Sequence, residues 1–294
     1  QLGFEIAGQH ALAERHGAEF RSACFALRIE PLGTRWKVVY RQGEMLREII
    51  GQRLFLAGGG LHTPALLLRS RTALPRLSAH VGEGFNHNGE MQYAGILPQG
   101  FDEIDNYHCF KGMDNAGLMT FHWYESHGFT LHPGGGIEPS IFAAAIVSGS
   151  ALAATPEVEL PRRGWGLEYK RFVESVYPSR VIGFSSLGLA ASHAAVTVRP
   201  DGTPDVVARD RREYDSYLDR LEGVLRDLSR RTGVTIVPAY PRRYAGMTSA
   251  HLLASCRMSE RADSGVVNPD GVVWNYENLY ICDASAIPYA LGVN

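Results

Sequence analysis

The sequence has few cysteines, no paired metal-ligand motif and no long apolar run, and each absence excludes a class of protein. Its four cysteines lie at positions 24, 109, 256 and 282 without a CxxC pair, which argues against a disulfide framework and a zinc site. None of the eleven histidines belongs to an HxxxH or HExxH motif, so we expect no bound metal. No stretch approaches the roughly 20 apolar residues that span a bilayer, so no integral membrane segment is expected.

An excess of charge of one sign is also lacking. The 29 basic and 31 acidic residues give a formal net charge of −2, whereas a dedicated nucleic-acid-binding protein would be strongly basic. We therefore expect no nucleic-acid partner. A G-x-S-x-G motif is absent as well, which leaves acyl transfer by a serine nucleophile without support.

The first 80 residues predict two antiparallel strands, then a buried strand and a helix. Residues 20–28 and 34–40 are the strand candidates, and Arg53 to Ala57 form a short apolar run typical of a buried parallel strand. Gly58 to Gly60 make the turn, Thr63 is the expected N-cap and Pro64 the first helical residue. Such a turn is either a tight connection or a place where a phosphate rests on backbone N–H groups.

The rest of the chain has a different texture, rich in glycine, proline and aromatic residues. Asp201-Gly202 predicts a hairpin turn between two short extended runs, and residues 211–232 have the apolar spacing of one long helix that ends before Gly233. Residues 279–283 predict a strand ending in Asp283, which either caps a helix or faces a ligand. The fold class expected is α/β (α+β overall).

Three stretches carry a resemblance to a known family. They are HLLASCRMSERADSGVVNPDGVVWNYENLYICDASAIPYALGVN at the carboxyl end, LFLAGGGLHTPALLLRS, and LPRLSAHVGEGFNHNGE. Together they resemble the glucose–methanol–choline (GMC) flavin oxidoreductases, closest to the cholesterol oxidase branch and to the long-chain alcohol oxidases and dehydrogenases. The motifs are long and stand in the family's order.

The resemblance implies a division of the chain and an FAD cofactor. Residues 1–80 would form part of a Rossmann-like FAD-binding domain, 81–245 a substrate domain with a mainly antiparallel sheet covered by helices, and 246–294 a return to the FAD-binding domain. The family's GxGxxG fingerprint is absent from the sequence. We therefore expect an internal or carboxyl-terminal fragment, which alone does not hold FAD tightly.

The resemblance also implies site residues. His251 matches the catalytic histidine that acts as base for the substrate hydroxyl, and Asn294 matches its partner at the flavin. Glu138, before a proline, is a candidate for the glutamate of the cholesterol oxidases. The residues implied to bind the cofactor are Gly58, Gly59, Asn88, Asp283, Ala284 and Asn294.

The function implied is oxidation of an alcohol to a carbonyl by hydride transfer to flavin N5. The substrate expected is a sterol or another bulky hydrophobic alcohol. A sugar or polyol dehydrogenase of the same family, and a non-catalytic lipid- or carbohydrate-binding module, are the alternatives; the pair His251 and Asn294 favours an enzyme. The cytoplasm is favoured over secretion, which the amino end leaves open. The electron acceptor and the oligomeric state stay open.

Overall fold

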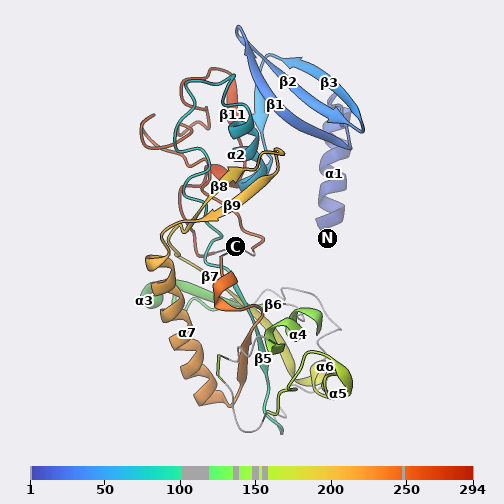
Figure 1. Ribbon diagram of the computed structural model, residues 1–294, viewed down its shortest axis with the longest axis vertical. Helices are drawn as coiled ribbons and strands as arrows, with labels where there is room; N and C mark the ends of the chain where they lie inside the picture. The colour runs from blue at the N-terminus through green and yellow to red at the C-terminus, as the bar shows by residue number, and fades with distance from the viewer. Residues whose placement is uncertain are drawn as a thin grey trace.

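The amino-terminal part of the chain forms a helix and an antiparallel meander in this computed structural model, which describes residues 2–100, 119–134, 139–147, 152–153, 158–246 and 249–293. Helix α1 (Leu2–Arg15) comes first. The meander runs in the order β1-β2-β3 (Figure 1). Its strands are β1 (Cys24–Leu32), β2 (Arg35–Gln42) and β3 (Met45–Gly51).

The meander differs from the sequence prediction in two ways. Strand β1 begins four residues later than expected, after Ala23, which has a positive φ of 54°. Strand β3 was not predicted, because all seven of its residues are exposed and its apolar residues come in pairs rather than alternating. A strand that buries neither face carries no period-two signal.

A parallel pair of strands joins two segments that lie far apart in the sequence. Strand β4 (Leu54–Leu56) pairs with β11 (Leu279–Ile281), which confirms the parallel strand predicted for residues 53–57. Helix α2 (Gly59–Arg69) follows β4 and begins four residues before Thr63, so the expected N-cap is wrong. The Thr63 hydroxyl instead accepts a hydrogen bond from Gly58 N at 2.9 Å.

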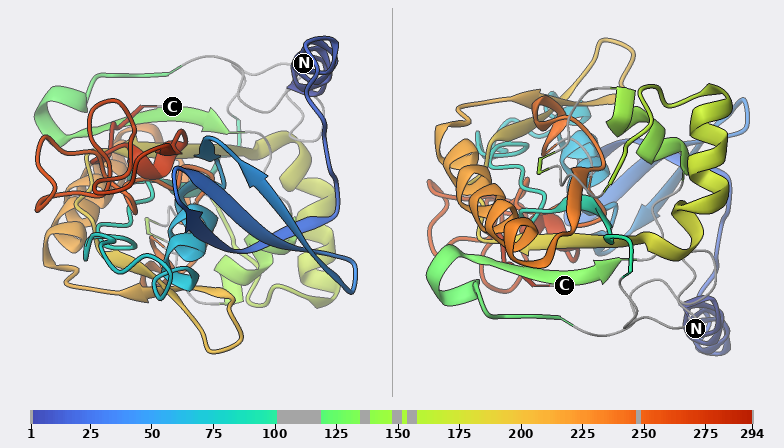
Figure 2. Two further views of the ribbon diagram at one scale, coloured as in Figure 1. Left: turned by 90° about the horizontal axis from the view of Figure 1, so that it is seen from above. Right: turned by 90° about the horizontal axis from the view of Figure 1, so that it is seen from below.

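A four-stranded antiparallel sheet in the order β10-β5-β7-β6 forms the second part of the molecule. One face packs against helix α7, and the other against α4, α5 and α6 (Figures 1 and 2). This confirms the expected mainly antiparallel sheet covered by helices. The strands are β5 (Met91–Ile96), β6 (Phe129–Gly134), β7 (Val181–Gly188) and β10 (Thr235–Pro238). The helices are α3 (Tyr124–His127), α4 (Pro139–Val147), α5 (Gly166–Ser175), α6 (Tyr177–Arg180), α7 (Arg212–Thr232) and the short 3₁₀ helix η1 (Arg242–Tyr244).

Helix α7 confirms the prediction from apolar spacing. Its buried side chains include Tyr214, Leu218 and Leu225, all fully or almost fully buried against the sheet. Burying one such side chain stabilises the fold by about 1.5–3 kcal/mol. The helix ends at Gly233, whose φ of 73° places it in the left-handed region that closes helices.

A two-stranded hairpin, which lies between β7 and α7 in the sequence, contacts α2. Strands β8 (Ala194–Val198) and β9 (Pro204–Ala208) confirm the predicted hairpin around Asp201-Gly202. Val196 N donates to Gly82 O at 2.8 Å, and Gly82 N donates to Ser255 O at 2.7 Å, so the hairpin is tied to the carboxyl-terminal segment. The boundaries predicted for the domains, near residues 80 and 245, stay predictions.

We predict that Gly60→Ala destabilises the protein. A Cβ at Gly60 would lie 2.5 Å from the backbone oxygen of Leu252, and backbone cannot move aside as a side chain can. We expect a loss of about 1–3 kcal/mol in the free energy of unfolding, measured by urea denaturation. Gly223→Ala is the control: nothing lies within 4 Å of its Cβ position in α7, so it should be neutral or add about 0.5–1 kcal/mol. Equal midpoints for the two variants would contradict the prediction.

Candidate active site

Residues 86–90, Asn-His-Asn-Gly-Glu, hold together two distant segments of the chain. They precede β5, and Asn86, Asn88 and Glu90 are each at least 96% buried. Asn86 and Leu253 exchange backbone hydrogen bonds of 3.0 and 2.8 Å. Glu90 contacts residues 249–251, and Asn88 contacts residues 291–293. The segment therefore brings the neighbourhood of His251 to the carboxyl end of the described chain.

Asn88 fixes the carboxyl-terminal segment through its side-chain amide. Its Oδ1 accepts from the N–H groups of Leu291 and Gly292, both at 2.9 Å, and its Nδ2 donates to Val293 O at 2.8 Å. The backbone of Asn88 has a φ of 59°, a left-handed conformation that asparagine tolerates better than most residues. The amide thus orients residues 291–293, and the assignment of Asn88 as a cofactor-binding residue stays a prediction.

The end of the sheet supports the same segment. Thr130 on β6 donates its hydroxyl to Gly292 O at 3.0 Å, and the Tyr124 hydroxyl donates to Leu291 O at 3.0 Å. The carboxyl end lies between the upper strands and the sheet, close to β7 (Figure 1).

His251 is held by a buried carboxylate. Its Nδ1 lies 2.8 Å from Glu90 Oε2, and the side chains of the two residues are 23% and 6% exposed. The same oxygen accepts from the Ser249 hydroxyl at 2.6 Å and from Ala250 N at 2.9 Å. One carboxylate oxygen is therefore the common partner of three consecutive residues.

The charge on Glu90 is stabilised where it lies. Burial opposes its ionisation, but the hydrogen bonds from His251, Ser249 and Ala250 outweigh burial and lower the pKa to about 2. Glu90 is thus a carboxylate at any physiological pH.

The neighbouring buried histidines carry no charge that could compete with it. His87 is fully buried, and burial together with His193 lowers its pKa to about 3. Burial also lowers the pKa of His193. His87 Nε2 and the Tyr214 hydroxyl lie 2.8 Å apart.

Four of the residues predicted to bind a cofactor, Gly58, Gly59, Asp283 and Ala284, lie where β4 and β11 end. Asp283 Oδ2 accepts from Gly59 N at 2.9 Å and from the Thr63 hydroxyl at 2.5 Å. Its Oδ1 accepts from Ser285 N and the Ser285 hydroxyl, at the start of the 3₁₀ helix η2 (Ala284–Ala286). Asp283 is therefore a cap for both α2 and η2. Its carboxylate lies at the N-terminus of α2.

Residues 252–256 connect this corner to His251. Ala254 N donates to Ala284 O at 3.3 Å, and the Ser255 hydroxyl donates to Gly60 O at 2.5 Å. Gly58 is exposed, and a Cβ at Gly59 would meet nothing within 4 Å. The corner can therefore take a ligand against its glycine backbone.

Two predicted site residues, Asn294 and Glu138, lie outside the described residues. Their roles, and the predicted proximity of His251 to Asn294, stay predictions. Glu90 is the functional candidate that sequence reasoning missed. Its only signal was an acid two positions after Asn88 in the N-H-N-G-E segment, and nothing in the sequence pairs it with a histidine 161 positions away.

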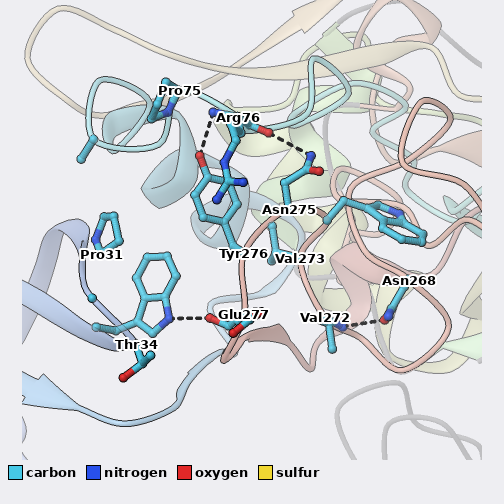
Figure 3. A pocket seen from close by; sticks show the side chains of 14 residues that line it. Pro31, Thr34, Pro75, Arg76, Asn268, Val272, Val273, Asn275, Tyr276 and Glu277 are labelled. Carbon is cyan, nitrogen blue, oxygen red and sulfur yellow. Dashed lines mark hydrogen bonds between the residues drawn. The ribbon is translucent and has the colours of Figure 1, made fainter.

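Other features of the described residues do not add to this site. A cavity of about 670 Å³ is lined by parts of the β1–β2 turn, the loop after α2, Asn268 and residues 272–277 (Figure 3), and His251 is not among its lining residues. Its walls are tied by hydrogen bonds from Arg76 N to the Tyr276 hydroxyl and from Trp36 Nε1 to Glu277 O. Within the described ranges no cluster of three or more His, Cys, Asp or Glu side chains could hold a metal ion. Nor does any helix there have the length and apolarity to cross a membrane.

Comparison with known sequences finds a family that matches the carboxyl-terminal part of the chain and related proteins that match longer or shorter parts of it. Residues 205–294 match the family described as GMC oxidoreductase. Long-chain-alcohol oxidase FAO1 of Arabidopsis thaliana is 35% identical over 262 residues, which cover 81% of this chain and 32% of that protein. Long-chain-alcohol oxidase FAO3 of the same plant is 47% identical over 47 residues, 16% of this chain and 6% of that protein. The chain thus spans less than two thirds of the length of these relatives.

Solved structures share the fold. Pyridoxine 4-oxidase from Mesorbium loti matches with a TM-score of 0.51 and 16% identity, over 92% of this chain and 53% of that chain. An FAD-dependent oxidoreductase from Chaetomium thermophilum matches with a TM-score of 0.53 and 17% identity, over 97% and 60% of the two chains. At such identities the likeness concerns the fold alone.

We predict that the ionised carboxylate of Glu90 stabilises the folded protein and that this stabilisation is lost in acid. Its pKa falls from 4.5 to about 2 on folding, so the folded state binds fewer protons. The stabilisation, about 3 kcal/mol, is present above about pH 4.5 and is lost as pH falls toward 2. Glu90→Gln should therefore be less stable than the parent at neutral pH and approach the parent's stability only near pH 2, in denaturant unfolding at each pH. Glu260→Gln, which removes an exposed carboxylate, is the control; a constant gap for Glu90→Gln would contradict the assignment.

Proposed function

Since this chain belongs to the GMC oxidoreductase family, we propose that it supplies the substrate side of an enzyme that oxidises an alcohol to a carbonyl compound with FAD. The observation that carries the proposal is the hydrogen bond from His251 to the buried carboxylate of Glu90. A non-catalytic lipid- or carbohydrate-binding module would gain nothing from an imidazole held by an ionised carboxylate.

His251 acts as the base for the substrate hydroxyl. A base must offer an unprotonated ring nitrogen, and a neutral imidazole has one. The side chain is partly exposed, so a small molecule can reach the ring. The proton of the alcohol passes to the imidazole, and the electron pair left on the alkoxide oxygen forms the carbonyl bond as the hydride leaves the neighbouring carbon.

FAD is the cofactor of the family, and when bound it accepts the hydride from the alcohol carbon. The described residues at this corner would contact such a group with backbone atoms rather than with charged side chains. Gly58 is exposed and Gly59 has open space beside its Cα, while the Asp283 carboxylate already accepts hydrogen bonds at the starts of α2 and η2. Gly58, Gly59 and Ala284 would hold the cofactor from the corner of β4 and β11. Residues 291–293, fixed by Asn88, would flank it on the other side.

Asn294 and Glu138 keep proposed roles. An amide at Asn294 orients the substrate hydroxyl without taking its proton, because an amide is not a base at neutral pH. Glu138 would approach the substrate from the substrate domain. Both roles follow from the family resemblance.

The substrate class we propose is a bulky hydrophobic alcohol. The names of the matched relatives, long-chain-alcohol oxidases, support a long-chain alcohol, and a sterol is the other member of the same class. No specific feature of the described residues favours a sugar or polyol.

We predict that His251→Ala, in the full-length protein that contains these residues, binds flavin but reduces it slowly. Loss of a general base typically lowers a rate by about 10²–10⁴-fold, or roughly 3–5 kcal/mol of barrier. The measurement is anaerobic single-turnover flavin reduction with a long-chain primary alcohol and with a sterol.

His16→Ala serves as the matched control, because His16 is exposed at the end of α1 and outside the site. It should reduce flavin at the parent rate. Parent-like reduction by His251→Ala would remove the base assignment, and a parent that reduces flavin with neither alcohol would overturn the substrate class.

A further inference from the structure

We propose that Glu90 is the positioning residue of this site: it fixes His251 in the tautomer that carries its proton on Nδ1 and leaves the lone pair on Nε2. The inference rests on the proposed role of His251 as a base. It adds a residue, a tautomer and an assignment of which nitrogen takes the substrate proton.

The tautomer follows from the partners of one oxygen. Glu90 Oε2 already accepts from the Ser249 hydroxyl and from Ala250 N, and an ionised carboxylate can only accept. A contact of 2.8 Å between this oxygen and Nδ1 therefore requires the proton to lie on Nδ1. When the ring is neutral, its single N–H is used there, so Nε2 is the nitrogen that can receive a proton.

The orientation is fixed from both sides. Ser249 donates its hydroxyl to Glu90 and accepts the backbone N–H of His251 at 2.8 Å, so the backbone of the histidine and the carboxylate share one anchor. The other carboxylate oxygen lies 3.3 Å from Gln92 Nε2. Rotation of the imidazole would leave a nearly buried carboxylate short of a donor, which is costly for a charged group.

Glu90 also acts when the proton arrives. Transfer of the hydroxyl proton to Nε2 turns the ring into an imidazolium 2.8 Å from a carboxylate, and an opposite charge at that distance favours the charged form. Among the described residues, His87 and Tyr240 also interact electrostatically with Glu90, and burial lowers the pKa of His87 and raises that of Tyr240. Burial therefore keeps both neutral, so Glu90 provides the stabilising charge.

The first test reads the tautomer without any turnover. ¹⁵N spectra of histidine-labelled holoprotein separate protonated from bare ring nitrogens, and His251→Gln identifies the signals of His251. We expect Nδ1 to be protonated and Nε2 to be unprotonated in the parent and in Glu90→Gln, because the amide oxygen of the glutamine still accepts the hydrogen bond from Nδ1. Glu90→Leu should lose this preference. A parent whose proton sits on Nε2, or exchanges between the two nitrogens, would overturn the proposal.

The second test reads the charge. Glu90→Gln keeps the acceptor but not the charge, so the acid limb of its pH–rate profile should move to lower pH and flavin reduction should slow about 10–100-fold, with a smaller change in the apparent substrate Kd. Glu222→Gln is the matched control, since Glu222 is a buried carboxylate in α7 paired with Arg226 and Arg242. It should keep the parent profile even if it loses stability.

The outcomes separate the two proposals. A parent that reduces flavin with an alcohol, beside a Glu90→Gln variant with the same rate and the same acid limb, refutes the role of Glu90 alone. A parent that reduces flavin with no alcohol refutes the proposed function, while the ¹⁵N spectra still decide the tautomer.

Discussion

Three hydrogen bonds to one oxygen of Glu90 are the interaction on which the site depends. They tie residues 249–251 to the start of β5, and the amide of Asn88, two positions earlier, ties residues 291–293 to the same segment. Buried polar groups hold a structure in one arrangement only when every partner is present. Here the partners come from three parts of the chain, so the site forms as a unit or not at all.

The same constraint explains how two separate cores share one site. One core lies among the meander, α2 and β11, and another lies between the sheet and α7. Neither core contains His251 or Glu90. These two residues are held by polar contacts among residues 249–251 and the start of β5, which fix the backbone of His251 while its side chain stays partly exposed.

Sequence reasoning recovered the elements that have a local signal. Apolar spacing predicted α7, and Asp201-Gly202 predicted the β8–β9 hairpin. It missed β3, which buries no face, and misplaced the start of α2, because the true partner of the helix N-terminus is Asp283 at the far end of the chain. Glu90 was missed for the same physical reason. The role of this carboxylate depends on a hydrogen bond to a residue far away in the sequence, and a local sequence pattern cannot predict such a bond.

The parallel pairing of β4 with β11 imposes an order on folding. Leu54 pairs with Leu279, and Leu56 with Ile281, although most of the chain lies between them. The entropy lost on closing this long loop opposes the pairing until the hydrogen bonds of the strand pair have formed. During synthesis on the ribosome, β4 and α2 leave the exit tunnel long before β11 exists. Until then the N-terminus of α2 lacks the carboxylate of Asp283. Late completion of the corner between β4 and β11 is the biosynthetic consequence of a strand pair made from segments far apart in the chain.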